Sequence, residues 1–153
     1  MNTLTSQLAT IVPASRLLGS EVLEARGGRA RVRFDHIPEL LEESGQLKPA
    51  AILAIAKTAS ASALISLLGI RAASTEMTVS AANARSSRIS RGGLIAESEV
   101  VGFRDAIVRD LERAGSSTIR TSIVIEDDSE RPVSEIFIDW HVQTATEGLR
   151  RAA

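Results

Sequence analysis

An apolar stretch rich in alanine and serine runs from Ala50 to Leu68. Drawn as a helix it is apolar on nearly every face, and a helix of that kind is buried on all sides. Pro49 suits the first position of a helix, and Gly69 suits a helix end. Lys57 stands in the middle of the stretch, where a membrane-spanning helix tolerates a charge poorly. The stretch therefore predicts the buried central helix of a soluble protein.

Strand-like patterns lie on both sides of this helix in the sequence. Before it, Glu21–Ala25 and Arg29–Phe34 flank Gly27 and Gly28, a strong signal for a two-residue hairpin turn. After it, period-two patterning predicts four strands, and helical spacing over Asp105–Ala114 interrupts them. The four strands are Met77–Asn83, Leu94–Phe103, Thr118–Glu126 and Val133–Val142.

The order of these elements predicts an α+β fold, in which a curved antiparallel sheet wraps around one long central helix. We expect a short helical turn over Pro38–Glu43 and a hairpin turn at Asp127–Ser129. The chain is expected to form one domain over residues 1–146, with an N-terminal helix over 2–17. Residues 147–153 are expected to be a loose tail.

The composition excludes several kinds of site. The 153 residues include no cysteine, so a disulfide framework, a Cys-ligated metal and a Cys nucleophile are excluded. The net charge of −1 argues against nucleic-acid binding through bulk charge. No histidine and carboxylate set has metal-ligand spacing, and the first residues lack the basic start of a secretory signal. We expect a cytoplasmic protein with no metal and no nucleic-acid or membrane partner.

The scarce lysines are the main functional signal. The chain has 18 basic residues, and only Lys48 and Lys57 are lysines. An ammonium on the leucine-bearing face of a buried helix must meet a carboxylate, a cavity or an interface. For Lys57 three roles stay open: an ion pair, direct ligand binding, or imine chemistry by a desolvated amine. The candidate ion-pair partners are Glu42, Glu43, Glu97, Glu99 or an acid of a partner chain.

Other side chains could take part in chemistry or binding. The run Arg85–Arg91 places three arginines among serines, a combination that suits phosphate but also an ordinary solvated loop. Glu43 precedes the helix and could supply a carboxylate, although a solvated acid is the simpler interpretation. Ser60 is a candidate hydroxyl, without a neighbouring histidine in the sequence to activate it.

The chain resembles the hotdog-fold thioesterases, such as the phenylacetyl-CoA type, in matches that follow one another in order from about Leu17 to Val142. Gly45–Ala51 resembles the family's stretch with a Gly and a His-Gly-Gly, and Ile55–Ala59 resembles its Leu-Ala-Asp-Thr-Ala helix. Met77–Arg85 and Gly92–Val101 are similar to its next two strands. The inserted helix over 105–114 and the tryptophan at position 140 resemble a related branch of unknown function.

The resemblance implies a homodimer formed through strand edges and an acyl-CoA or related thioester as substrate or ligand, with no other cofactor. It also implies an oxyanion hole made by backbone amides around 48–51. The family's catalytic His falls on Lys48 and its helical Asp or Glu falls on Lys57. The catalytic candidates are Lys57, Glu43 and Ser60, and the substrate-binding candidates are Gly45, Lys48, Ala50, Ala51, Asn83, Arg85 and Arg88.

Three functions remain open at this point. The first is an acyl-CoA thioesterase with a changed catalytic set. The second is a non-catalytic protein that binds an acyl thioester or another small molecule. The third is another hotdog reaction, such as dehydration or a specialised biosynthetic step. Fold resemblance alone does not decide among them.

Overall fold

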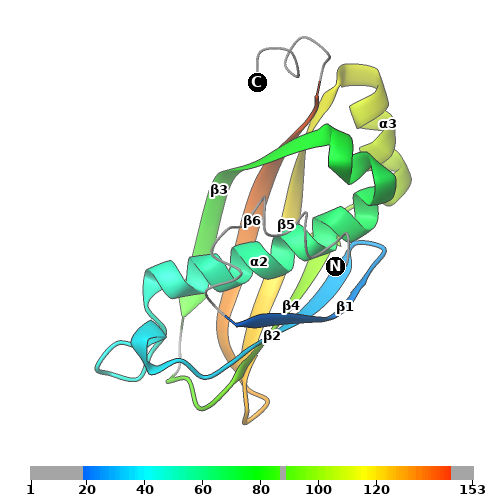
Figure 1. Ribbon diagram of the computed structural model, residues 1–153. Coiled ribbons are helices and arrows are strands. Elements are labelled where there is room, and N and C mark those ends of the chain that lie inside the picture. The colour runs from blue at the N-terminus through cyan, green and yellow to red at the C-terminus, as the bar shows by residue number, and fades with distance from the viewer. Residues whose placement is uncertain (1–18, 87–88, 146–153) are drawn as a thin grey trace.

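A computed structural model describes residues 19–86 and 89–145. Six strands form one antiparallel sheet in the order β1-β2-β4-β5-β6-β3, and helix α2 lies across one face of it (Figure 1). The elements in chain order are β1 (Ser20–Arg26), β2 (Arg29–Phe34), a 3-10 turn (Pro38–Leu40), α2 (Pro49–Leu68), a second 3-10 segment (Gly69–Ser74), β3 (Thr75–Ser86), β4 (Leu94–Val101), α3 (Arg104–Ala114), β5 (Ser116–Asp127) and β6 (Pro132–Thr144).

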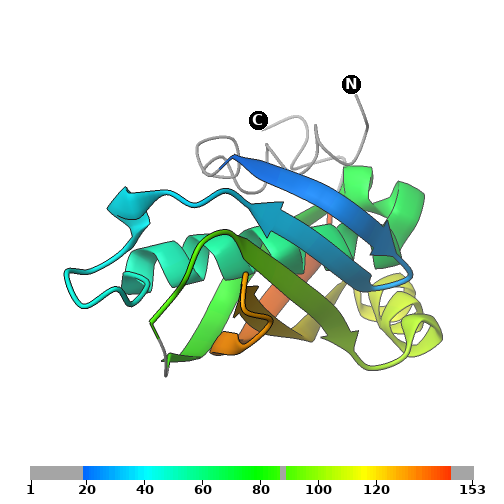
Figure 2. The same cartoon turned by 90° about the horizontal axis from the view of Figure 1, so that it is seen from below.

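The hydrophobic core lies between α2 and the inner face of the sheet. Figure 2 shows α2 in the hollow of the curved sheet, with β1 and β2 on one side of it. Alternate strand residues point inward, so Val32, Phe34 and Ile138 are completely buried while the arginines between the inward residues of β2 are exposed. Burying each large apolar side chain contributes about 1.5 to 3 kcal/mol. The alternation thus fixes which face of each strand meets the helix.

Helix α2 has the boundaries that the sequence predicts. It starts at Pro49, whose missing amide costs nothing in the first turn, and ends at Leu68 before Gly69, which has φ 60°. The stretch Pro49–Ser74 is long and apolar enough to cross a membrane, but 78% of its most apolar window is buried inside the fold. It is the core helix of a soluble domain, and the predicted α+β class is confirmed.

All six predicted strands are present, but only β2 has the predicted bounds, and the C-terminal ends of β3 and β4 show why. β3 continues to Ser86, beyond the predicted end at Asn83, because its last residues pair with β6 through the backbone and need no apolar alternation. β4 stops at Val101 instead of Phe103, because Gly102 takes φ 122° and turns the chain towards α3. The expected N-terminal helix over 2–17 and the tail over 147–153 lie outside the described residues.

Candidate functional site

The start of α2 leaves backbone donors without partners. Helix starts have N–H groups that no helical carbonyl can accept, and no side chain caps this one. Pro49 has no N–H, and the Lys48 amide donates to the Leu40 carbonyl at 2.8 Å. The amides of Ala50 and Ala51 have no acceptor among the described residues. These two N–H groups are therefore open to an anion or a carbonyl oxygen, whereas the Lys48 amide is already bonded.

A tight turn holds the chain just before the helix. Leu41 and Leu47 form an isolated β-bridge, and Gly45 donates to the Glu42 carbonyl at 2.9 Å. The Gly45 carbonyl accepts a 3.0 Å hydrogen bond from the Ser90 amide. This bond joins the turn to the loop that precedes β4, so the end of the arginine-rich run lies beside the turn that precedes α2.

Two aspartates of the β5–β6 turn anchor the other side of this loop. The carboxylate of Asp127 accepts a 3.0 Å bond from the Arg91 amide, and that of Asp128 accepts a 3.0 Å bond from the Gly93 amide. Burial raises the pKa of Asp127, but the hydrogen bonds it accepts from Ser129, Arg91 and Arg131 lower it by more, so its pKa lies below the ordinary range. Sequence reasoning placed a turn here and missed this anchoring role, although an Asp at a turn that binds nearby amides is a recognisable signal.

Replacing Asp127 with Asn should lower the free energy of unfolding by about 1 to 2 kcal/mol at pH 7, because the neutral amide accepts these bonds more weakly. Because the pKa of Asp127 is lower in the folded than in the unfolded state, its ionised carboxylate stabilises the fold fully at pH values above the unfolded-state pKa of about 3.9. This stabilisation is lost as the pH falls through the folded-state pKa. Denaturation at pH 7 and near pH 2.5 checks this. A stability gap between wild type and variant that stays constant at both pH values would contradict it.

The run Arg85–Arg91 suits either phosphate binding or a solvated loop by its sequence. Arg85 is exposed near the end of β3, Arg91 is exposed in the loop anchored by Asp127, and neither forms an ion pair with a described residue. Asn83 is also exposed on β3, while Arg88 lies outside the described residues. The end of β3 and the start of α2 lie at the same end of the molecule in Figures 1 and 2. Two free guanidiniums therefore stand at the end of the fold that holds the helix start.

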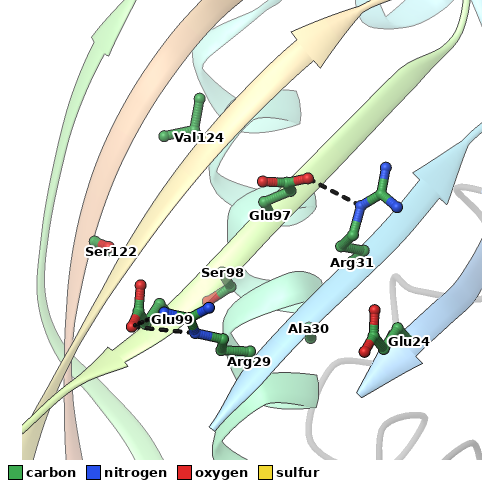
Figure 3. Close-up of a pocket in the computed structure, with 9 residues that line it drawn as sticks. All are labelled: Glu24, Arg29, Ala30, Arg31, Glu97, Ser98, Glu99, Ser122 and Val124. Atoms are coloured by element: carbon green, nitrogen blue, oxygen red, sulfur yellow. Dashed lines mark hydrogen bonds and ion pairs between the residues drawn. The ribbon is translucent and has the colours of Figure 1, made fainter. Parts of the chain in front are cut away.

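The two lysines differ in their surroundings. Lys48 is the exposed residue that precedes α2, and Lys57 is half-buried in the middle of the helix. Of the three roles left open for Lys57, an ion pair with one of the four named acids of its own chain is not found. Glu97 and Glu99 lie 2.9 Å from Arg31 and Arg29 on the outer face of the sheet, as Figure 3 shows. The acids Glu42 and Glu43 are exposed in the turn before α2 and form no ion pair with Lys57.

Ser60 belongs to a buried hydrogen-bond network of the core. Its hydroxyl accepts the indole N–H of Trp140 at 2.5 Å and lies 2.6 Å from the Thr121 hydroxyl. All three residues are completely buried. Glu43 stands on an exposed turn, so the structure does not bring Ser60, Glu43 and Lys57 together. We leave Ser60 out of the site because its hydroxyl is enclosed and already bonded on the sheet side of α2.

Two surface grooves lie away from the helix start. One, of about 330 Å³, runs over the outer face of β2, β4 and β5, and paired Arg and Glu side chains line it (Figure 3). The other, of about 610 Å³, lies between α3 and the end of β6, beside the Arg71–Glu112 ion pair. No candidate site residue lines either groove. We therefore do not assign the candidate site to either groove, although both are large.

Comparison with known proteins identifies the fold. No protein-family model and no curated protein matches the chain. A probable thioesterase of unknown function from Pseudomonas aeruginosa is similar to it, with a TM-score of 0.75 and 14% identity over 94% of this chain and 97% of the other. The PaaI protein of the phenylacetic acid degradation operon of E. coli has a TM-score of 0.69 and 17% identity, over 90% and 94%. A hypothetical thioesterase from Streptococcus pneumoniae, solved with coenzyme A, has a TM-score of 0.66 and 13% identity, over 94% and 97%.

These similarities establish the class of structure. The chain has the hotdog fold of thioesterase-like proteins, in which a curved antiparallel sheet wraps around a long central helix. The resemblance expected from the sequence is thereby confirmed at the level of the fold. At these identities the activity of the similar proteins does not pass to this chain with the fold.

Proposed function

We propose that this chain binds an acyl-CoA or a related acyl thioester at the start of α2. The observation that carries the proposal is the uncapped first turn, where the amides of Ala50 and Ala51 point out of a helix with no protein acceptor among the described residues. The thioester carbonyl would accept these two bonds, and the positive end of the helix dipole would strengthen them. The S. pneumoniae protein with this fold, solved with coenzyme A, supports this ligand class.

The charged residues around the helix start suit the rest of such a ligand. Arg85 and Arg91 carry guanidiniums with no acid partner among the described residues, and phosphates are the anions that guanidiniums bind best. Arg88 would join them. Lys48 is exposed at the helix start and would contact the thioester end of the ligand. Gly45 holds the turn before α2 through its backbone hydrogen bonds. Asn83 is exposed on β3, the strand that carries Arg85.

Hydrolysis is the second candidate, and the names of the similar thioesterases favour it. In this proposal Lys48 and Lys57 stand at the positions that, by the sequence resemblance, correspond to the His and the Asp or Glu of hotdog thioesterases. A protonated lysine cannot act as a base, so a nearby carboxylate would have to activate water. Glu43 is the described acid of the turn before α2 that we assign to this role. Because Glu43 is exposed on that turn, binding without turnover is the function that the geometry supports best.

The proposal includes a cytoplasmic homodimer. β3 ends the sheet with a long exposed edge from Thr75 to Ser86, and such an edge is a template for pairing with a second copy. A partner strand there would lie beside the end of the molecule that holds Arg85 and the helix start. Sedimentation at micromolar concentration checks this assembly, and a monomer would contradict it.

Thermal unfolding with coenzyme A, acetyl-CoA and longer acyl-CoAs tests binding, and a thiol-reactive dye tests turnover in the same samples. A ligand at about 100 times its Kd should stabilise the fold by about 2.7 kcal/mol.

Ala50→Pro removes one of the two amide donors in the exposed first turn of α2, and Ala50→Ser keeps the donor as the control. We expect the proline variant to lose most of the ligand-induced shift. Absence of any shift across the panel would refute the proposed function, and thiol release would establish hydrolysis.

A further inference from the structure

Lys57 carries a half-buried charge that no described residue balances. Every ion pair of the described residues uses an arginine, so none involves Lys57. The side chains of Glu97 and Glu99 lie on the outer face of β4, and the inward residues of that strand lie between them and α2. An ammonium partly removed from water and left without an anion is costly. An anion from outside the described residues would stabilise this ammonium.

Lys57 stands at the end of an open apolar strip on α2, which we define as Ala50, Leu53 and Ala54. Leu53 is 42% exposed, Ala50 is exposed and Ala54 is half-buried. Further along the same side of the helix, Leu64 is completely buried. The accessible side of α2 thus begins at the uncapped amides, continues over small and apolar side chains, and ends at a cation.

The spacing fits a short acyl chain. From Ala51 to Lys57 a rise of about 1.5 Å per residue gives about 9 Å along the helix axis. Side chains on a helix lean towards its N-terminus, so the ammonium lies closer to the first-turn amides than this distance. A thioester bound at those amides would direct its acyl group along the open strip towards Lys57.

The chemistry at the end of the strip selects among acyl groups. A plain alkyl chain would place methylene and methyl groups against the ammonium and remove water from it without replacing its hydrogen bonds. An acyl chain that ends in a carboxylate would instead form a charge-assisted hydrogen bond. We infer, on the basis of the proposed binding function, that the site prefers thioesters of short dicarboxylic acids, whose free carboxylate pairs with Lys57.

The test compares two CoA esters of equal chain length, glutaryl-CoA and valeryl-CoA, which differ by the terminal carboxylate. Dissociation constants come from calorimetry, or kcat/KM values replace them where turnover is found. We expect glutaryl-CoA to bind about tenfold or more tightly, as a hydrogen bond to a charged group provides. Lys57→Met should bring the ratio of the two affinities close to one, and Lys57→Arg should keep the preference.

Arg113→Met is the matched control, because Arg113 is exposed on α3 and its loss changes the net charge by the same amount. It should leave the ratio as in the wild type. Equal binding of both esters by the wild type overturns this inference alone, whereas absence of binding by these two esters and by the rest of the acyl-CoA panel overturns the proposed function with it. If the Lys57→Met variant still prefers glutaryl-CoA, the free carboxylate of the glutaryl group pairs with another cation, and the proposed role of Lys57 is wrong.

Discussion

Replacing Trp140 with phenylalanine should lower the free energy of unfolding by about 2 to 4 kcal/mol. Trp140 is completely buried, and its indole N–H donates to the Ser60 hydroxyl at 2.5 Å. The smaller ring leaves a cavity in the core, and the substitution also removes that hydrogen bond. Urea denaturation monitored by circular dichroism measures the change without relying on the fluorescence of the only tryptophan in the chain.

A double-mutant cycle separates the hydrogen bond from the cavity. Ser60→Ala leaves the buried indole N–H without its acceptor and should cost about 1 to 3 kcal/mol. Combined with Trp140→Phe it should cost less than the sum of the two, because the second substitution removes the stranded donor. Additive costs would show that the two side chains do not interact. Ser60→Ala should also keep the ligand-induced thermal shift, whereas a Ser60 that contacts the ligand would lose much of it.

The sequence predicts the fold well because the fold follows from patterns that local sequence carries. The alternation in Arg29–Phe34 sets one buried and one exposed face, and the structure has these bounds for β2. The all-round apolar helix had to be buried, and Pro49 and Gly69 marked its ends. Strand ends were less certain, since backbone pairing extends β3 to Ser86 without any apolar pattern.

The site was predicted only in part, because its geometry depends on contacts between distant segments. The sequence placed backbone donors at the start of the central helix, but the Lys48 amide bonds to the Leu40 carbonyl. Among the described residues, the Ala50 and Ala51 amides are the ones left without an acceptor. The role of Ser60 depends on Trp140, which is 80 positions further along the chain. A buried tryptophan needs an acceptor for its N–H, so a serine on the central helix was an available partner, but no spacing rule selects Ser60.

The contact between Gly45 and Ile89 connects the fold to the proposed site, and its disruption should have a large effect on both. Gly45 has φ 86°, and a Cβ at this position would lie 2.8 Å from the Cγ2 atom of Ile89. Gly45→Ala should therefore add a steric clash to the cost of a left-handed backbone, for a total of about 2 to 4 kcal/mol in the free energy of unfolding. The clash would push away the loop whose Ser90 amide binds the Gly45 carbonyl.

Gly115→Ala is the matched control for this substitution. Gly115 has φ 73°, and a Cβ there would meet nothing within 4 Å, so its replacement carries the backbone cost alone. Ile89→Ala in the Gly45→Ala background should recover the part of the loss that comes from the clash. Because Arg91 lies in this loop, Gly45→Ala should also weaken coenzyme A binding more than Gly115→Ala does. Equal stability losses in the two glycine variants, with no recovery from Ile89→Ala, would show that the packing of the loop against the turn does not hold the helix start in place.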